Sequence, residues 1–250
     1  YGGTINGGSV AATALGLTTS GGTLNGVTLL GDFGTASSTY AYVTGGSTFT
    51  GPNATFGASS GIYWQQTGTL SGKSVTMGNG SYLYVSAANS SLTIASTTSF
   101  TGDISLYTDG SAGTSIHNQG TLTHTLGNGT LSARTFTNSG TITATTGSLN
   151  LGTSSAGYSF VNAAGSTLTV AGATVSLQAP IGSPFTNHGT LAVQSGTLHT
   201  NNQLTQAPGS TLSGAGTITG HVKVEGGTLA PGNSGLGTLT FSSGALTITG

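Results

Sequence analysis

The amino-acid sequence predicts an all-β protein that folds as a right-handed parallel β-helix (a β-solenoid) of roughly eleven coils, each of about 19–25 residues. Three observations lead to this prediction. Glycine recurs too often for helices, apolar and threonine residues alternate with a period of two, and a longer unit of about 22 residues repeats along the chain.

Glycine, threonine and serine make up half of the 250 residues, and 45 residues are glycine. Each glycine costs about 1 kcal/mol in a helix interior, so helices are disfavoured. Short segments such as 121–123, 141–143, 167–170 and 217–219 instead alternate Thr with Leu, Ile or Val. This pattern predicts strands with one aliphatic face, closed by turns of Gly, Asn and Ser. The 34% hydrophobic content and the net charge of −1 argue against disorder.

The longer repeat is clearest in the second half of the chain. Five related segments share an apolar residue, an amide two positions later and a closing Thr-Leu or Thr-Ile: 116–122, 136–142, 160–168, 185–191 and 204–212. Because coils of a solenoid stack in register, equivalent residues should become neighbours about 4.8 Å apart. We therefore expect structural ladders of inward aromatic rings and of corner amides, formed by Phe136, Phe160, Phe185, Asn118, Asn138, Asn162 and Asn187.

These repeats predict a single β-solenoid domain over residues 1–250. A leucine-rich repeat would need a helix in each unit, and units of this length and composition leave no room for one. The open ends of a solenoid expose unpaired strand edges, and neither the first nor the last residues resemble a polar cap. We therefore expect the chain to be a segment of a longer rod or one unit of a filament.

The C-terminal region carries a more specific motif. Gly-Thr-Leu-Ala-Pro-Gly-Asn-Ser at 227–234 is followed by Gly-Thr-Leu-Thr-Phe at 237–241. Residues 212–241 resemble the passenger-associated repeat of bacterial autotransporters and related surface proteins. The resemblance implies a right-handed β-helix that is secreted or displayed on the bacterial cell surface and that serves in adhesion, aggregation or biofilm formation.

Composition excludes several functions. Only 3% of residues are charged, which leaves no basic surface for nucleic acid and few carboxylates for catalysis. The absence of cysteine removes disulfides and thiolate chemistry, and no apolar run is long enough to span a bilayer. Asp103 and Asp109 flank a predicted strand, so we expect both to be solvated turn residues. The five histidines, at positions with no metal-ligand spacing, are expected in surface turns: His117, His124, His188, His199 and His221. We therefore predict no catalytic residue, no cofactor and no metal.

The tyrosines form the most informative group. Tyr42, Tyr63, Tyr84 and Tyr107 are spaced by 21, 21 and 23 residues, and aliphatic residues precede them in matching positions. If the aliphatic residues point inward, these tyrosines stack outside at the coil spacing, and Tyr40 and Tyr82 extend the same surface. Such a column either stabilises its own sheet or forms an interface or a platform for sugar rings.

These observations favour a non-enzymatic, extracellular structural or adhesive β-solenoid in a surface layer, fibre or biofilm. The expected partners are other copies of the chain, end to end or side by side, or a cell-surface glycan. The alternative is a carbohydrate-binding module that uses the tyrosines. A polysaccharide-active enzyme and an ice-binding protein rank below these, the latter because coil lengths vary and the threonines scatter among Ser, Ala and Asn. With so few titratable groups, we expect stability to be nearly independent of pH between pH 4 and 9.

Overall fold

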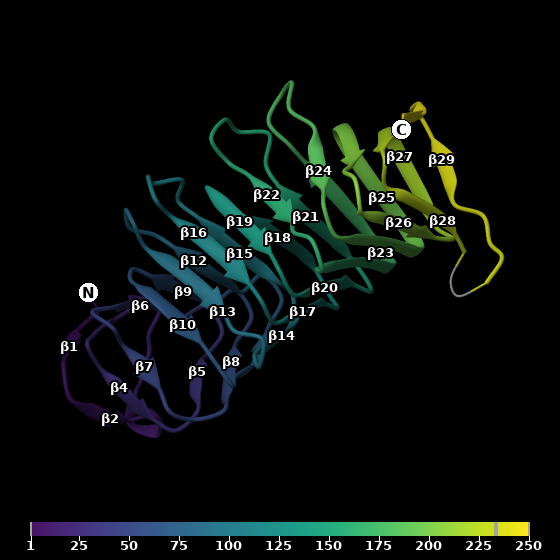
Figure 1. Cartoon of the computed structure of the whole chain (residues 1–250). Helices are drawn as coiled ribbons and strands as arrows, with labels where there is room; N and C mark the ends of the chain where they lie inside the picture. The colour runs from purple at the N-terminus through teal and green to yellow at the C-terminus, as the bar shows by residue number, and fades with distance from the viewer. Residues whose placement is uncertain (1, 233–234, 250) are drawn as a thin grey trace.

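A computed structural model describes residues 2–232 and 235–249 and confirms the all-β prediction. Parallel strands wind into a solenoid of about 12 turns, against the roughly eleven predicted (Figure 1). The described residues contain one short helix, the 3-10 turn η1 (Ala12–Ala14), next to the first coil. Residues 233 and 234 of the C-terminal motif lie outside the described residues.

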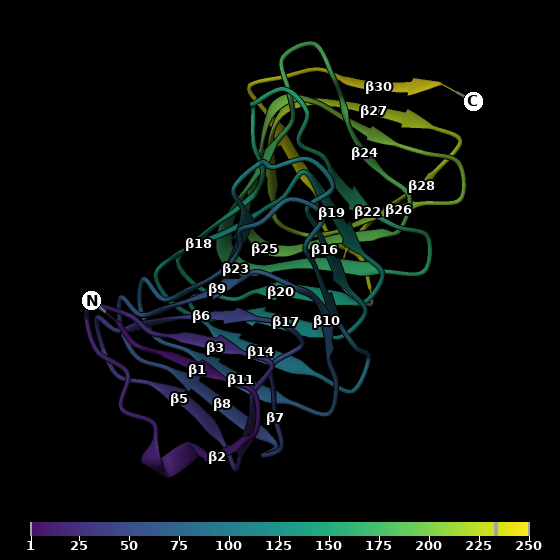
Figure 2. The ribbon, with the colours of Figure 1, turned by 90° about the vertical axis from the view of Figure 1, so that its left-hand side faces the viewer.

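Each complete turn contributes strands to three faces of the solenoid, which we call face 1, face 2 and face 3. Within a face, described strands one turn apart pair in parallel, with one break on face 2 between β7 and β10 (Figure 2). Long strands β23, β25 and β27 bend around the corners and so belong to more than one face.

Face 1 runs the whole length of the stack. Its strands are β1 (Thr4–Asn6), β3 (Thr23–Asn25), β6 (Tyr40–Thr44), β9 (Gly61–Trp64), β12 (Tyr82–Val85), β15 (Ser105–Thr108), β18 (Asn128–Ser132), β21 (Ser148–Gly152), part of β23 (Thr167–Gln178), part of β25 (Thr190–Gln206), part of β27 (Thr217–Glu225) and β29 (Thr240–Ser242).

Face 2 follows face 1 in each turn. Its strands are β2 (Ser9–Ala11), β4 (Thr28–Leu30), β7 (Thr48–Phe49), β10 (Thr67–Leu70), β13 (Ser91–Ile94), β16 (Ser115–Asn118), β19 (Thr135–Asn138), β22 (Phe160–Asn162), β24 (Phe185–Asn187), the ends of β25 and β27, and β30 (Leu246–Thr249).

Face 3 completes the turn. Its strands are β5 (Phe33–Thr35), β8 (Asn53–Phe56), β11 (Ser74–Met77), β14 (Ser99–Gly102), β17 (Thr121–His124), β20 (Thr141–Ala144), the beginnings of β23 and β25, β26 (Thr211–Gly214) and β28 (Thr228–Pro231).

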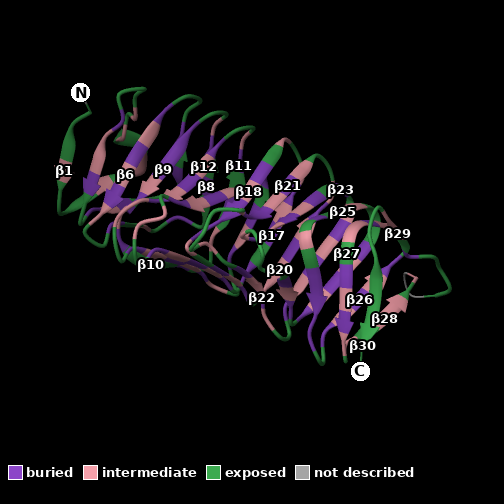
Figure 3. Ribbon diagram, turned by 90° about the horizontal axis from the view of Figure 1, so that it is seen from above, coloured by how far each residue is buried: buried purple, intermediate pink, exposed green. Residues whose placement is uncertain are grey.

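The core is the interior of the coil, where side chains from all three faces meet. Alternation along each strand puts every second residue inside, so buried and exposed positions alternate along the ribbons (Figure 3). On face 3, for example, Phe100 stacks on Leu122 and Leu122 on Ile142, and all three are at most 1% exposed. In-register aliphatic columns of this kind remove apolar surface from water along the whole rod.

Face 2 is interrupted once. Strands β2, β4 and β7 form a separate three-stranded sheet, whereas the later strands of face 2 belong to the main sheet. Within the described residues, β7 pairs only with β4 and β10 only with β13, so no ladder joins β7 to β10. Face 1 stays continuous through the same turns, as β6 pairs with β9, and face 3 does so through β8 and β11.

Candidate functional site

The six tyrosines singled out in the sequence lie together on the outer surface of face 1, and we call them the tyrosine strip: Tyr40, Tyr42, Tyr63, Tyr82, Tyr84 and Tyr107. The register aligns Tyr42 with Tyr63, Tyr63 with Tyr84, and Tyr84 with Tyr107. The residues between them on the same strands, such as Leu83, point into the core and are buried. All six tyrosines are half-buried, because each ring packs against neighbouring rings of the strip.

The rings make a continuous set of contacts. Tyr42 and Tyr63 are stacked with ring centroids 4.7 Å apart, and Tyr84 and Tyr107 lie 4.8 Å apart. The Tyr82 hydroxyl group donates to that of Tyr63 at 3.2 Å. Tyr82 fits because its register partner is Gly61, where a Cβ atom would overlap the Tyr82 ring. Each aromatic pair contributes about 0.5–1.5 kcal/mol beyond its buried area, so the strip both stabilises face 1 and presents an amphipathic surface.

The environment of the strip raises the pKa of four of its phenol groups. Burial, followed by the neighbouring Tyr63 and Tyr84, raises the pKa of Tyr107 to about 12. Burial and the hydrogen bond with Tyr63 raise the pKa of Tyr82, and burial also raises those of Tyr42 and Tyr84. The strip therefore offers hydroxyl donors and ring faces, not charge.

Tyr158 extends the strip and was missed by the sequence analysis. It lies in the loop between β21 and β22, and its hydroxyl group packs against the backbone of Gly110. Tyr158 and Tyr107 line a hollow of about 330 Å³ together with Ser and Thr hydroxyls such as those of Thr130 and Ser132. No repeat-spaced partner marks Tyr158, so period alone could not place it beside Tyr107.

The four asparagines form a buried ladder at the end of face 2. Asn118 Nδ2 donates to Asn138 Oδ1 at 2.8 Å, Asn138 to Asn162 at 2.8 Å, and Asn162 to Asn187 at 2.7 Å. The ladder continues to Gln206 Oε1 at 2.8 Å, a fifth rung at the amide of the last repeat. Each of these side chains is fully buried, so the ladder is structural and offers no surface to a ligand.

The predicted aromatic ladder occupies the same turns. Phe136 and Phe160 are stacked with centroids 5.0 Å apart, and Phe160 and Phe185 lie 5.6 Å apart. All three rings are buried inside the coil. They stabilise the interior and do not belong to a binding surface.

The outer surface of face 3 carries two columns of hydroxyl side chains. The register gathers outward Ser and Thr residues into these columns, which Asn53 precedes and Ala192 follows. Five consecutive turns carry Ser or Thr at both outward positions: Ser74 and Thr76, Ser99 and Thr101, Thr121 and Thr123, Thr141 and Thr143, Thr167 and Thr169. Differences in coil length lie outside the strands of face 3, so the hydroxyl columns stay aligned. Ice binding is therefore an alternative that can be tested.

The structure also corrects the placement of Asp103 and His124. Both were expected in solvated turns, but they are only 2% and 1% exposed. Asp103 Oδ2 accepts a hydrogen bond from Gly80 N at 2.7 Å, and its Oδ1 lies 3.9 Å from His124 Nδ1. His124 Nδ1 accepts from Ile104 N at 3.2 Å, which requires a neutral ring at that nitrogen. Burial lowers the pKa of His124 and outweighs the opposing effect of Asp103.

Asp109 and the other four histidines lie at the surface as expected, but three of these histidines lie in strands and not in turns: His117 in β16, His199 in β25 and His221 in β27. Asp109 is exposed and its Oδ1 accepts from Ser111 N at 2.8 Å, a local turn bond. His188, His199 and His221 are exposed and His117 is partly exposed. Over residues 2–232 and 235–249, no three His, Asp or Glu side chains gather as a metal site would require. The same residues include no helix with the length and apolarity of a membrane span.

Comparison with protein-family models, with curated proteins and with solved structures finds no match for this chain. The geometry of the surfaces described above is therefore the basis for a functional proposal.

Proposed function

We propose that this chain is a non-enzymatic structural or adhesive module of a bacterial cell surface or extracellular matrix, and that the tyrosine strip is its contact surface. The observation that carries the proposal is the strip itself: six mutually packed, half-exposed aromatic rings on the outside of a rod with very few charges. Aromatic residues are enriched, and most charged residues depleted, at the centres of protein interfaces.

The strip suits lateral association between rods. Its rings already restrict one another's rotamers through mutual packing. A partner that buries their apolar area would therefore cost little further side-chain entropy. The neutral phenols of Tyr82 and Tyr107 can hydrogen-bond across the contact. The resemblance of residues 212–241 to passenger-associated repeats supports an extracellular bacterial setting.

Sedimentation of the wild-type chain and of a variant with Tyr42, Tyr63, Tyr84 and Tyr107 replaced by Ser tests this proposal. We expect concentration-dependent association of the wild type and its loss in the variant. A matched control replaces four outward hydroxyl residues of face 3 by Ala, at positions 76, 101, 123 and 143, and should associate like the wild type. Association that is absent, or equal in both variants, would remove the strip as the contact surface.

A carbohydrate-binding module is the second candidate, and the hollow between Tyr107 and Tyr158 favours it. Ring faces bordered by hydroxyl groups suit a sugar, which offers apolar C–H faces and hydroxyls on one ring. A glycan array compares wild type with Tyr158→Ser. Binding lost in this variant, with self-association retained, would assign the hollow to a glycan, and an array without binding would eliminate this candidate.

A further inference from the structure

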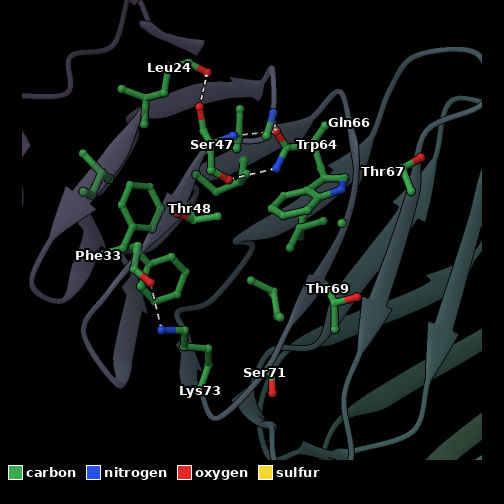
Figure 4. A pocket seen from close by; sticks show the side chains of 18 of the residues that line it. Leu24, Phe33, Ser47, Thr48, Trp64, Gln66, Thr67, Thr69, Ser71 and Lys73 are labelled. Carbon is green, nitrogen blue, oxygen red and sulfur yellow. Dashed lines mark hydrogen bonds between the residues drawn. The ribbon is translucent and has the colours of Figure 1, made fainter. Parts of the chain in front are cut away.

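The break in face 2 opens a cavity into the interior of the solenoid. A cavity of about 290 Å³ lies between β7 and β10, where the two strands fail to pair. Its wall is formed by core side chains, among them Phe33, Phe56 and Trp64 (Figure 4). From β10 onward each described strand of face 2 has a parallel partner in a neighbouring turn, and β22 and β24 share the single register pair Asn162 and Asn187.

Trp64 explains why the break stays open. Its register partners in the neighbouring turns are Val43 and Val85, so an indole replaces an isopropyl group in this inward column. The ring reaches beneath β10, where a Cβ atom at Gly68 would lie only 2.8 Å from Trp64 Cζ2. Trp64 Nε1 also donates to Ser91 O at 3.0 Å, which fixes the ring on the side of β13.

Side chains already hydrogen-bond the Phe49 carbonyl of β7 and the backbone on either side of this strand at the opening. Gln66, just before β10, accepts from Gly46 N at 2.9 Å and Ser47 N at 3.0 Å, and donates to Ser47 O at 2.9 Å. Lys73, three residues after β10, donates to Phe49 O at 2.9 Å and to Gly51 O at 2.7 Å. An added peptide strand would have to displace these bonds, so the opening favours a ligand that needs no backbone ladder.

Among the residues that line the cavity, Lys73 carries the charge. Its ammonium group lies 4.3 Å from the Phe49 ring centroid, and no carboxylate of the described residues lies within ion-pair distance of it. Asp32 is near enough to interact with it, since the pKa of Asp32 is lowered by hydrogen bonds with Asn53 and, to a smaller extent, by Lys73. Its third contact, with Thr50 O, is long at 3.5 Å, which leaves one proton for a stronger acceptor. A ligand carboxylate there would gain a charge-assisted hydrogen bond.

The size of the cavity limits the ligand. A cavity of roughly 150 Å³ with an apolar lining holds benzene, so about 290 Å³ suits an apolar group of about ten carbons. We propose that this cavity binds a small monocarboxylate with an apolar tail, of the medium-chain fatty acid class. The tail lies between Phe33, Phe56 and Trp64, and the carboxylate meets Lys73.

Trp64 makes the proposal directly measurable, because it is the single tryptophan of the chain. Its fluorescence is titrated with octanoate and with octan-1-ol, which has the same tail and no charge. We expect a saturable change with both ligands. Lys73→Met should weaken octanoate binding about tenfold and leave octanol binding unchanged. Lys223→Met is the matched control, because this lysine pairs with Glu225 far from the cavity and its loss should change neither affinity.

A second variant tests the cavity itself. Val43→Phe should fill it and abolish the fluorescence response to both ligands, with circular dichroism and a thermal melt confirming that the variant folds. The proposal is overturned if octanoate gives no saturable change in the wild type, or if Lys73→Met weakens both ligands equally. It is also overturned if Lys223→Met has the same effect as Lys73→Met.

Discussion

The asparagine ladder makes Asn162→Ala the most informative single substitution for stability. Asn162 sits in the middle of the ladder and is fully buried. Its Nδ2 donates to Asn187 Oδ1 at 2.7 Å and to Thr190 O at 3.2 Å. Its Oδ1 accepts from Asn138 Nδ2 at 2.8 Å and from Ser166 Oγ at 2.9 Å. Alanine removes all four hydrogen bonds at once and leaves buried polar partners on both neighbouring turns.

The size of the effect follows from those partners. A buried hydrogen bond contributes about 1 kcal/mol net, so four sum to about 4 kcal/mol. Asn138 Nδ2 keeps a bond to Thr167 O at 3.3 Å and Ser166 Oγ keeps one to Ala163 O at 2.6 Å, which reduces the loss. We therefore expect Asn162→Ala to lower the free energy of unfolding by about 3–4 kcal/mol.

Asn25→Ala is the matched control. Asn25 also donates to an asparagine one turn away, Asn6 Oδ1 at 2.9 Å, but this pair is exposed to water. Its loss should change stability by less than about 0.5 kcal/mol. Urea unfolding measures both variants, and amide hydrogen exchange shows whether turns next to residue 162 open first, as nearest-neighbour stacking requires. Equal losses in the two variants would refute the argument that burial makes the ladder stabilising.

Three further predictions concern pH and the hydroxyl columns. Because burial lowers the pKa of His124 below its ordinary 6.5, neutral His124 favours the folded state, so the free energy of unfolding should fall as pH drops below about 6.5. Chemical unfolding at pH 4 to 8 should show this fall in the wild type and a flatter profile in His124→Gln. Because the pKa of Tyr107 rises to about 12, stability should fall as pH rises from about 10 toward 12, and Tyr107→Phe should reduce that fall in the same assay. Under the adhesive proposal, freezing-point measurements should show no thermal hysteresis, and a hysteresis abolished by Thr123→Lys would assign the hydroxyl columns of face 3 to ice binding.

The prediction for His124 modifies the expectation, drawn from composition, that stability is nearly independent of pH. That expectation rests on the small number of charged groups in the chain. Burial of a single histidine is enough to create a pH-dependent range, because the neutral ring is tied to Ile104 N inside the coil. Counting titratable residues does not reveal which of them are buried.

The period of the sequence determined most of the fold and both kinds of ladder. A solenoid stacks equivalent residues at a fixed spacing, so residues one repeat apart must become neighbours. For that reason the sequence alone predicts that Tyr63 lies beside Tyr42 and Tyr84, and that Asn138 lies beside Asn118. Alternation then decided that the tyrosines face outward, because the residues between them are aliphatic.

Only the tertiary structure decided the break between β7 and β10, the position of Tyr158 beside Tyr107, and the burial of Asp103 with His124. These features depend on the backbone course of the corners and loops and on the size of the Trp64 side chain. Neither of these two factors repeats with a period of two or of 22 residues. The sequence by itself determined which residues repeat and therefore which stack. Whether a turn is filled depends on how side chains of different volume pack together inside the coil. The cavity lies at a turn where this packing is incomplete.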